Sequence, residues 1–210
     1  MRNEQKNIRN ICELLKQLTG SIWIAVKFDG GESIDDTKPL RFCEAIYKAK
    51  QNNIVLSCST VCCDGAKRCF GWLKNSDKEL AMKLAEKVGI DMNTACRLIS
   101  SVPVVNNPCS FISLSQDDNA DVFITYTDPE SAMRFVRLWQ KVTGQNLNIE
   151  ISGIMSICGN AVVRSYINQT ISISLGCPDS RKYGGIKQDQ LVIGVPNKLA
   201  KLLFQGMNKL

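Results

Sequence analysis

Histidine is absent from the 210 residues of this sequence, and its absence removes several classes of functional site. A metal site must be built from cysteine thiolates and carboxylates, because no imidazole is present to share the coordination. A serine-protease triad, a Cys–His nucleophile pair and a histidine-based zinc-protease site are excluded for the same reason. The chemistry of this chain must therefore come from other side chains.

Long apolar runs are also missing. No run approaches the roughly 20 residues that a membrane-spanning helix needs, and the polar start MRNEQK lacks the apolar core of a signal peptide. Apolar residues make up 44% of the chain and charged residues 22%, which is typical of soluble globular proteins. We therefore expect a cytoplasmic protein with no membrane association.

Concentrated positive charge is the third absence. The formal net charge is +6, but lysine and arginine are spread along the chain, and the only notable pairs are Lys67-Arg68 and Arg181-Lys182. Since no basic run with interleaved aromatic residues occurs, we expect no binding to nucleic acid. A positive surface would suit docking to an acidic redox partner protein.

Cysteine, by contrast, is abundant. The chain has ten cysteines, about 5% of its residues, a high share for a cytosolic protein whose thiols stay reduced. Small secreted domains use so many cysteines as disulfides, but this chain has neither their size nor a secretory leader. Metal binding or redox chemistry is therefore the favoured use of these thiols.

The stretch 57–71 holds four of the cysteines, which are Cys58, Cys62, Cys63 and Cys69. It follows a short apolar run, 54–57, that predicts a strand, and it leads into 66–73, which predicts a helix. Unpaired N–H groups at a helix start attract anions and lower the pKa of nearby thiols. This turn is therefore the place in the sequence best suited to hold thiolates.

The remaining pattern predicts a mixed α/β fold, with α+β as the alternative. We expect one domain over residues 1–210, in which helices pack on a central sheet. The predicted strands are 22–28, 54–57, 111–115, 122–126, 147–152, 171–175 and 191–195. The predicted helices are 8–18, 42–50, 66–73, 94–100, 158–166, 197–204, one opened by Ser76 and Glu79 as a capping box, and one that starts at Asp128-Pro129 and ends at Gly144.

Cysteines far apart in the sequence share one kind of position. Cys43, Cys62 or Cys63, and Cys158 lie at predicted helix starts, and Cys177 follows a strand end. Such junctions converge at one edge of a sheet, so these residues can form one site. Four thiolates commonly hold an iron–sulfur cluster, and we expect a 4Fe-4S or larger cluster here with an electron-transfer or redox-sensing role.

Two other uses of these thiols stay open. One is a structural zinc ion held by four cysteines. The other is an enzyme that acts on a small anionic substrate through a cluster or a reactive thiol, with Arg181 and Lys182 as anion or cofactor contacts. The spacing of Cys58, Cys62, Cys63 and Cys69 matches neither the usual ferredoxin runs nor a zinc ribbon.

Several short motifs occur in a consistent order over nearly the whole chain. They are Phe42-Cys43-Glu44-Ala45, Cys63-Asp64-Gly65-Ala66 followed by Phe70-Gly71, Asp128-Pro129-Glu130, Cys158 with Ala161-Val162, Cys177-Pro178-Asp179-Ser180-Arg181, and Ile193-Gly194-Val195-Pro196. In this pattern the chain resembles the domain of unknown function 169, also called ArCR, of archaea and anaerobic bacteria. The resemblance implies a cytoplasmic protein of an anaerobe, matches Cys43, Cys63, Cys158 and Cys177 to the family's pattern, and supplies no activity.

Three cysteines have a simpler interpretation. Cys12 lies on the apolar face of the first predicted helix, and Cys96 and Cys109 have no companion thiol nearby in the sequence. We expect these three side chains to contribute packing rather than metal coordination.

Overall fold

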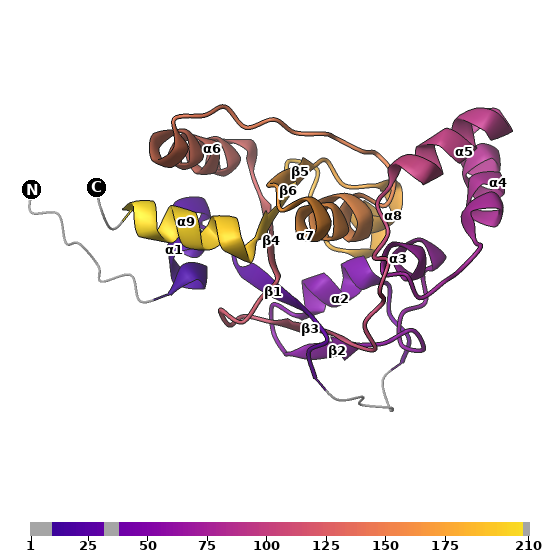
Figure 1. The fold of residues 1–210 in the computed structure, drawn as a ribbon, viewed down its shortest axis with the longest axis horizontal. Helices are drawn as coiled ribbons and strands as arrows, with labels where there is room; N and C mark the ends of the chain where they lie inside the picture. The colour runs from indigo at the N-terminus through magenta and orange to yellow at the C-terminus, as the bar shows by residue number, and fades with distance from the viewer. Residues whose placement is uncertain (1–9, 32–37, 208–210) are drawn as a thin grey trace, which may run out of the picture.

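A six-stranded sheet forms the centre of the molecule (Figure 1). The computed structural model describes residues 10–31 and 38–207. Its strands are β1 (Trp23–Phe28), β2 (Ile54–Leu56), β3 (Ile112–Ser115), β4 (Val122–Thr127), β5 (Ser172–Ser174) and β6 (Leu191–Pro196). They lie in the order β2-β3-β1-β4-β6-β5, and each neighbouring pair is antiparallel.

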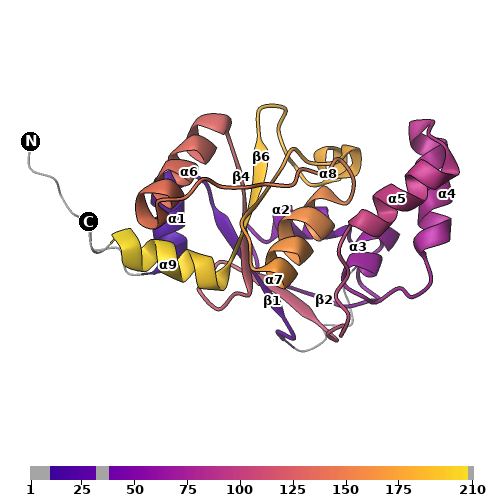
Figure 2. The same ribbon diagram turned by 45° about the horizontal axis from the view of Figure 1, so that its top comes forward.

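Helices cover both faces of this sheet (Figures 1 and 2). One face carries α1 (Ile11–Thr19), α6 (Pro129–Thr143) and α9 (Asn197–Met207). The other face carries α2 (Phe42–Lys48), α3 (Asp64–Cys69), the π-helix η1 (Ser156–Arg164), α7 (Ser165–Asn168) and α8 (Pro178–Tyr183). The prediction of a mixed α/β fold with helices packed on a central sheet is confirmed.

The alternation of side chains along β1 separates the two cores. Trp23 and Ala25 are buried with α1, α6 and α9, whereas Ile24, Val26 and Phe28 are buried with the helices of the opposite face. This is the period of two that a strand imposes on its side chains. The predicted cysteine ligands all lie on the second face, as described below.

Helices α4 (Asp77–Val88) and α5 (Met92–Ser101) form a hairpin that projects to one side of the sheet (Figures 1 and 2). They pack on each other around Ala81, Ala95 and Ile99. The buried Arg68 guanidinium ties the start of α4 to the body, because it donates two hydrogen bonds to the Asp77 carboxylate, at 2.7 and 2.9 Å, and one to the carbonyl of Val102 at 2.9 Å.

Several predicted boundaries need correction. The strand predicted over 147–152 is wrong, because this extended segment has no neighbouring strand to pair with, although Leu147 and Ile149 pack on the core. The helix predicted over 66–73 begins earlier and ends earlier, at Asp64–Cys69. Ser76 does precede α4, but its backbone is already helical and its side chain makes no capping hydrogen bond.

Other local signals are confirmed. Asp128 accepts a hydrogen bond from the Ser131 backbone N–H at 2.9 Å, Pro129 occupies the first turn of α6, and Gly144 ends the helix in the left-handed conformation with φ of 69°. Gly20 ends α1 in the same way, with φ of 65°. The start of the helix predicted over 8–18 lies partly outside the described residues, since those begin at Asn10.

Within residues 10–31 and 38–207, no helix has the length and hydropathy of a membrane span.

Candidate metal centre

Cys43 and Cys63 begin two neighbouring helices. Cys43 is buried in the first turn of α2, and Cys63 is the half-buried N-cap residue of α3. The segments before these helices pair with each other: the Leu40 N–H donates to the Thr60 carbonyl at 2.8 Å, and the Cys62 N–H donates to the Leu40 carbonyl at 2.9 Å. This short parallel pairing brings the starts of α2 and α3 together.

Cys177 is the N-cap residue of α8, a helix that sequence reasoning did not predict. Its backbone N–H donates to the Ser180 hydroxyl at 2.8 Å, and Pro178 follows in the first turn. The start of α8 lies against the start of α2, because Arg41 pairs with Asp179 at 3.3 Å and the Cys43 sulfur lies 4.0 Å from the Asp179 carbonyl.

Cys158 lies in the first turn of η1, a nine-residue π-helix preceded by Met155 in the left-handed conformation with φ of 44°. π-Helical geometry is rare in proteins, and where it does occur it is frequently at a functional site. The next residue must be glycine: a Cβ at Gly159 would lie 2.4 Å from the Val102 side chain and 3.2 Å from the Cys69 sulfur. The close packing of η1 on its neighbours therefore fixes the position of Cys158.

These four cysteines line one cavity of about 110 Å³, together with Arg41, Met155 and other residues of the same face. The cavity is several times the roughly 10–15 Å³ that a single water needs. We call it the thiol cavity. The structure thus brings Cys43, Cys63, Cys158 and Cys177 together from α2, α3, η1 and α8, and their role as ligands stays a prediction.

The surroundings of Cys43, Cys63 and Cys158 favour the protonated form of these three thiols. Burial, with the nearby Cys63 and Cys177, raises the pKa of Cys43 to about 12. Burial also raises the pKa of Cys63. A hydrogen bond with the Cys69 side chain, together with burial, raises the pKa of Cys158 well above its usual value. Since metal ions bind the thiolate, metal binding here must release protons.

The thiols of the cavity do not close around a single ion. In the described part of the chain there is no group of three or more cysteine, aspartate or glutamate side chains that could hold one metal ion. A four-thiolate zinc site needs all of its sulfurs at about 2.3 Å from one centre. The thiols of the cavity are therefore not arranged as a site for one metal ion in this structure, and their use as metal ligands stays a prediction.

The other cysteines lie outside the thiol cavity. Cys62 is exposed in the wider groove beside it, and Cys58 is exposed in the turn before α3. Cys69 is fully buried behind Cys158, and its thiol contacts the Met155 sulfur at 3.6 Å. Cys12, Cys96 and Cys109 lie apart from the cavity, on α1, on α5 and beside Trp72.

Arg181 and Lys182 are not among the residues that line the thiol cavity. The Arg181 guanidinium donates to the carbonyls of Leu175, Lys187 and Gln190 and so holds the loop between α8 and β6. Lys182 is exposed and lies over the Tyr183 ring. The cation that does line the cavity is Arg41, which sequence reasoning missed although it directly precedes the motif that contains Cys43.

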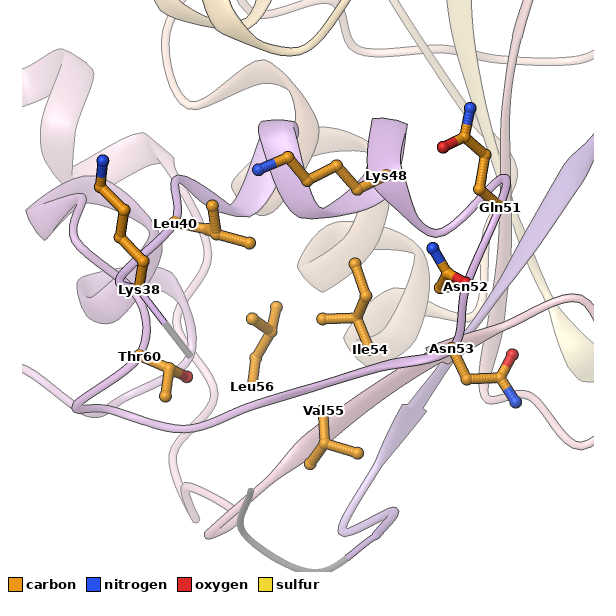
Figure 3. Close-up of a pocket in the computed structure, with 10 residues that line it drawn as sticks. All are labelled: Lys38, Leu40, Lys48, Gln51, Asn52, Asn53, Ile54, Val55, Leu56 and Thr60. Atoms are coloured by element: carbon orange, nitrogen blue, oxygen red, sulfur yellow. The ribbon is translucent and has the colours of Figure 1, made fainter. Parts of the chain in front are cut away.

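A separate cavity of about 350 Å³ lies between α2 and the sheet edge at β2 (Figure 3). Figure 3 shows Ile54 and Leu56 of β2 facing it, with the amide side chains of Gln51, Asn52 and Asn53 at one end and Lys38 at the other. None of the predicted site residues lines it, and among the described residues that do, none carries a thiol or a carboxylate. It is therefore distinct from the candidate metal centre.

Comparison with known proteins agrees with the motifs along the chain. The model of the domain of unknown function 169, described as uncharacterised ArCR, matches residues 21–206. The chain belongs to this family. An uncharacterised protein of Methanocaldococcus jannaschii is 28% identical over 222 aligned residues, which cover 97% of this chain and 93% of the relative. No solved structure matches the chain.

The match includes all four cysteines of the thiol cavity, since each lies within residues 21–206. The predicted membership of the ArCR family is therefore confirmed, and the similar protein is archaeal, as expected.

Cys12, which lies outside the thiol cavity, should make the folding stability of this ArCR protein depend on pH. Burial and the neighbouring Asp118 raise the pKa of Cys12 from about 9 to about 12. Between these values the unfolded chain loses the proton while the folded chain keeps it, so folding stability falls as the pH rises. At pH 10.5 we expect Cys12 to account for roughly 2 kcal/mol of lost stability, at about 1.4 kcal/mol per pH unit.

Urea unfolding at pH 8 and pH 10.5 measures this effect. The Cys12→Ala variant should lose less stability between the two pH values than the unsubstituted protein does, and Cys58→Ala, which removes an exposed thiol, should behave like the unsubstituted protein. Equal losses in all three proteins would contradict the assignment to Cys12.

Proposed function

We propose that this protein binds an iron–sulfur cluster through Cys43, Cys63, Cys158 and Cys177 and uses it for electron transfer or redox sensing. One observation carries the proposal: four thiols from four helix starts, 134 positions apart at the extremes of 43 and 177, line a single cavity. Iron–sulfur clusters are held by cysteine thiolates, commonly four. When bound, the cluster would supply the one-electron chemistry that the side chains themselves lack.

The sequence spacing of the cysteines favours a cluster over zinc, because the chain has none of the CxxC pairs of a zinc ribbon. A structural zinc ion draws four thiolates to one centre, and the thiols of the cavity are not arranged around one ion. A cluster distributes its thiolate ligands over different iron atoms and so accepts ligands that are further apart. Cys62, exposed beside Cys63, is the residue that would serve as an additional or alternative ligand.

The position of the cavity also suits exchange of electrons with a partner. Cys63, Cys158 and Cys177 are half-buried rather than fully enclosed, so a cluster held by them would lie near the surface. The net charge of +6 favours an acidic redox partner over a basic one. The cytoplasm of an anaerobe, where thiols stay reduced, is the compartment that we propose for this protein.

Anaerobic purification followed by iron and acid-labile sulfide analysis tests the proposal. We expect brown protein with a broad visible absorption band, with iron and sulfide in equal amounts and an electron paramagnetic resonance signal in one redox state. One zinc per chain with negligible iron would favour the structural zinc alternative. Colourless protein without iron and sulfide after cluster reconstitution would refute the cluster.

A further inference from the structure

A wide groove lies beside the thiol cavity. Its volume is about 600 Å³, and it shares Arg41, Cys63 and Cys177 with the thiol cavity. This size falls within the range of about 300–1,000 Å³ that is typical of small-molecule sites. A molecule in this groove, which we call the α4 groove, would lie directly against the proposed metal centre.

The wall of the α4 groove is apolar and incompletely covered. Leu80, Leu84 and Val88 line it from successive turns of α4, and Ile154 and Met155 also line it. Of these α4 side chains, Leu80 and Leu84 are only half-buried and Val88 is 57% exposed. An apolar stripe left open to solvent beside a cavity is typical of a binding site.

Charge is distributed unevenly along the α4 groove. At the end near Cys177, Arg41 and Lys87 share a single carboxylate, that of Asp179, at 3.3 and 2.9 Å. Beside Cys63, Lys83 pairs with Asp64 of the groove lining at 3.0 Å and with Glu79, which lies outside that lining, at 2.7 Å. The groove lining therefore has three cations, Arg41, Lys83 and Lys87, and two carboxylates, Asp64 and Asp179. Two of the cations share one carboxylate beside Cys177, so positive charge is in excess there.

Lys182 adds to the positive end, since it is one of the three cations that lower the pKa of Asp179, after Lys87 and Arg41. The Arg41 guanidinium can also present several N–H donors in one plane, an arrangement that matches a carboxylate. The part of the groove around Arg41 and Lys87 thus suits one negative group, while the α4 stripe suits a hydrocarbon.

We infer that the α4 groove binds an organic monocarboxylate, with the hydrocarbon against Leu80, Leu84 and Val88 and the carboxylate at Arg41 and Lys87. The binding itself follows from the shape and charge of the groove alone. Only the placement of the ligand beside a cluster rests on the proposed function. The cations assigned here are Arg41 and Lys87, whereas the sequence pointed to Arg181 and Lys182.

Calorimetric titration of the anaerobically purified full chain with octanoate tests this inference. Octanoate should bind at a single saturable site, because it combines one carboxylate with a hydrocarbon chain. Acetate, which lacks the chain, and octylammonium, which reverses the charge, should each bind at least about tenfold more weakly, the equivalent of one good polar contact. Equal binding of octanoate and octylammonium would overturn the assignment of an anion site.

Matched variants place the ligand within the groove. Arg41→Gln and Leu84→Gln should each weaken octanoate binding by about tenfold. Arg97→Gln on α5 and Met82→Gln on α4 remove an arginine and an apolar side chain outside the groove lining and should leave binding unchanged. Unchanged binding in both groove variants, with folding verified by circular dichroism, would overturn the inference.

The metal content of the same samples separates this inference from the proposed function. Octanoate binding by protein that carries no iron would support the groove and refute the cluster. Iron and sulfide in protein that does not bind octanoate would support the cluster and refute the groove. Where both are present, octanoate should also shift the visible or electron paramagnetic resonance spectrum, and an unchanged spectrum would contradict the placement of the ligand beside the cluster.

Discussion

Serine in place of Cys43, Cys63, Cys158 or Cys177 is expected to remove most of the bound iron and sulfide from anaerobically prepared protein. Each of these thiols lines the thiol cavity, and a serine oxygen is a poor substitute for a soft thiolate at iron. A serine at any of the four positions is nearly the same size as the cysteine it replaces, so the fold should survive the change. Iron and sulfide analysis, together with the visible spectrum, measures the loss.

Serine at Cys12, Cys96 or Cys109 provides the matched control. These thiols lie outside the cavity, and their replacement should leave the metal content intact and cost roughly 0.5–3 kcal/mol of stability. Cys62→Ser distinguishes two versions of the site: partial loss of iron would indicate a larger cluster, and no change would make Cys62 a bystander. Loss of metal in the Cys12, Cys96 and Cys109 variants rather than in the cavity variants would show that the site lies elsewhere.

Alanine in place of Gly194 is expected to destabilise the fold by about 3 kcal/mol, at the upper end of what an overpacked core usually costs. A Cβ at Gly194 of β6 would lie 1.9 Å from the carbonyl oxygen of Ala161 in η1. Because the clashing atom belongs to the backbone, no change of rotamer relieves the contact, and η1 must move away from the sheet. Chemical denaturation measures the change in free energy of unfolding.

The same substitution should also affect the metal centre, because η1 carries Cys158. We expect the Gly194→Ala protein to bind less iron under conditions in which it remains folded. Gly153→Ala is the matched control: no atom lies within 4 Å of its added Cβ, so stability should change little or rise slightly. A Gly194→Ala protein as stable as the parent would contradict the packing of η1 on β6.

Features that depend on short stretches of sequence were predictable. The start and end of α6 follow from Asp128, Pro129 and Gly144, whose side chains and backbone preferences act within one or two turns. The predicted strand over 191–195 corresponds to β6, and the predicted strand over 122–126 corresponds to β4, because both have runs of apolar residues long enough to be buried in the sheet.

Features that depend on distant partners were not predictable in the same way. In the segment 147–152, apolar residues alternate with polar ones as they do in a strand. A strand nevertheless forms only where a neighbouring strand pairs with it. The stripe on α4 has the pattern of a buried face, yet of α4 only Ala81 is buried, because the hairpin stands to one side of the sheet. Helix α8 has six residues, too few for a periodic pattern to be recognised.

The four cysteines were grouped from the sequence because they lie at helix starts or strand ends that were expected to converge at one edge of the sheet. The structure brings them together for a different reason. The sheet is antiparallel, so the helix starts are not gathered by the ends of parallel strands. They meet because the Leu40–Val61 bridge joins the starts of α2 and α3 and because α8 and η1 pack against α2. The contacts of α8 and η1 with α2 span more than a hundred residues and leave no local signal.

The lengths of the outermost strands bear on how copies of this protein behave at high concentration. β2 and β5, which form the two edges of the sheet, have three residues each. An edge strand offers unpaired backbone N–H and C=O groups to another chain, and short edges are one means by which proteins resist edge-to-edge aggregation. With its six-residue strands β1, β4 and β6 all enclosed between neighbours, the sheet offers other molecules little backbone on which to extend into a fibril.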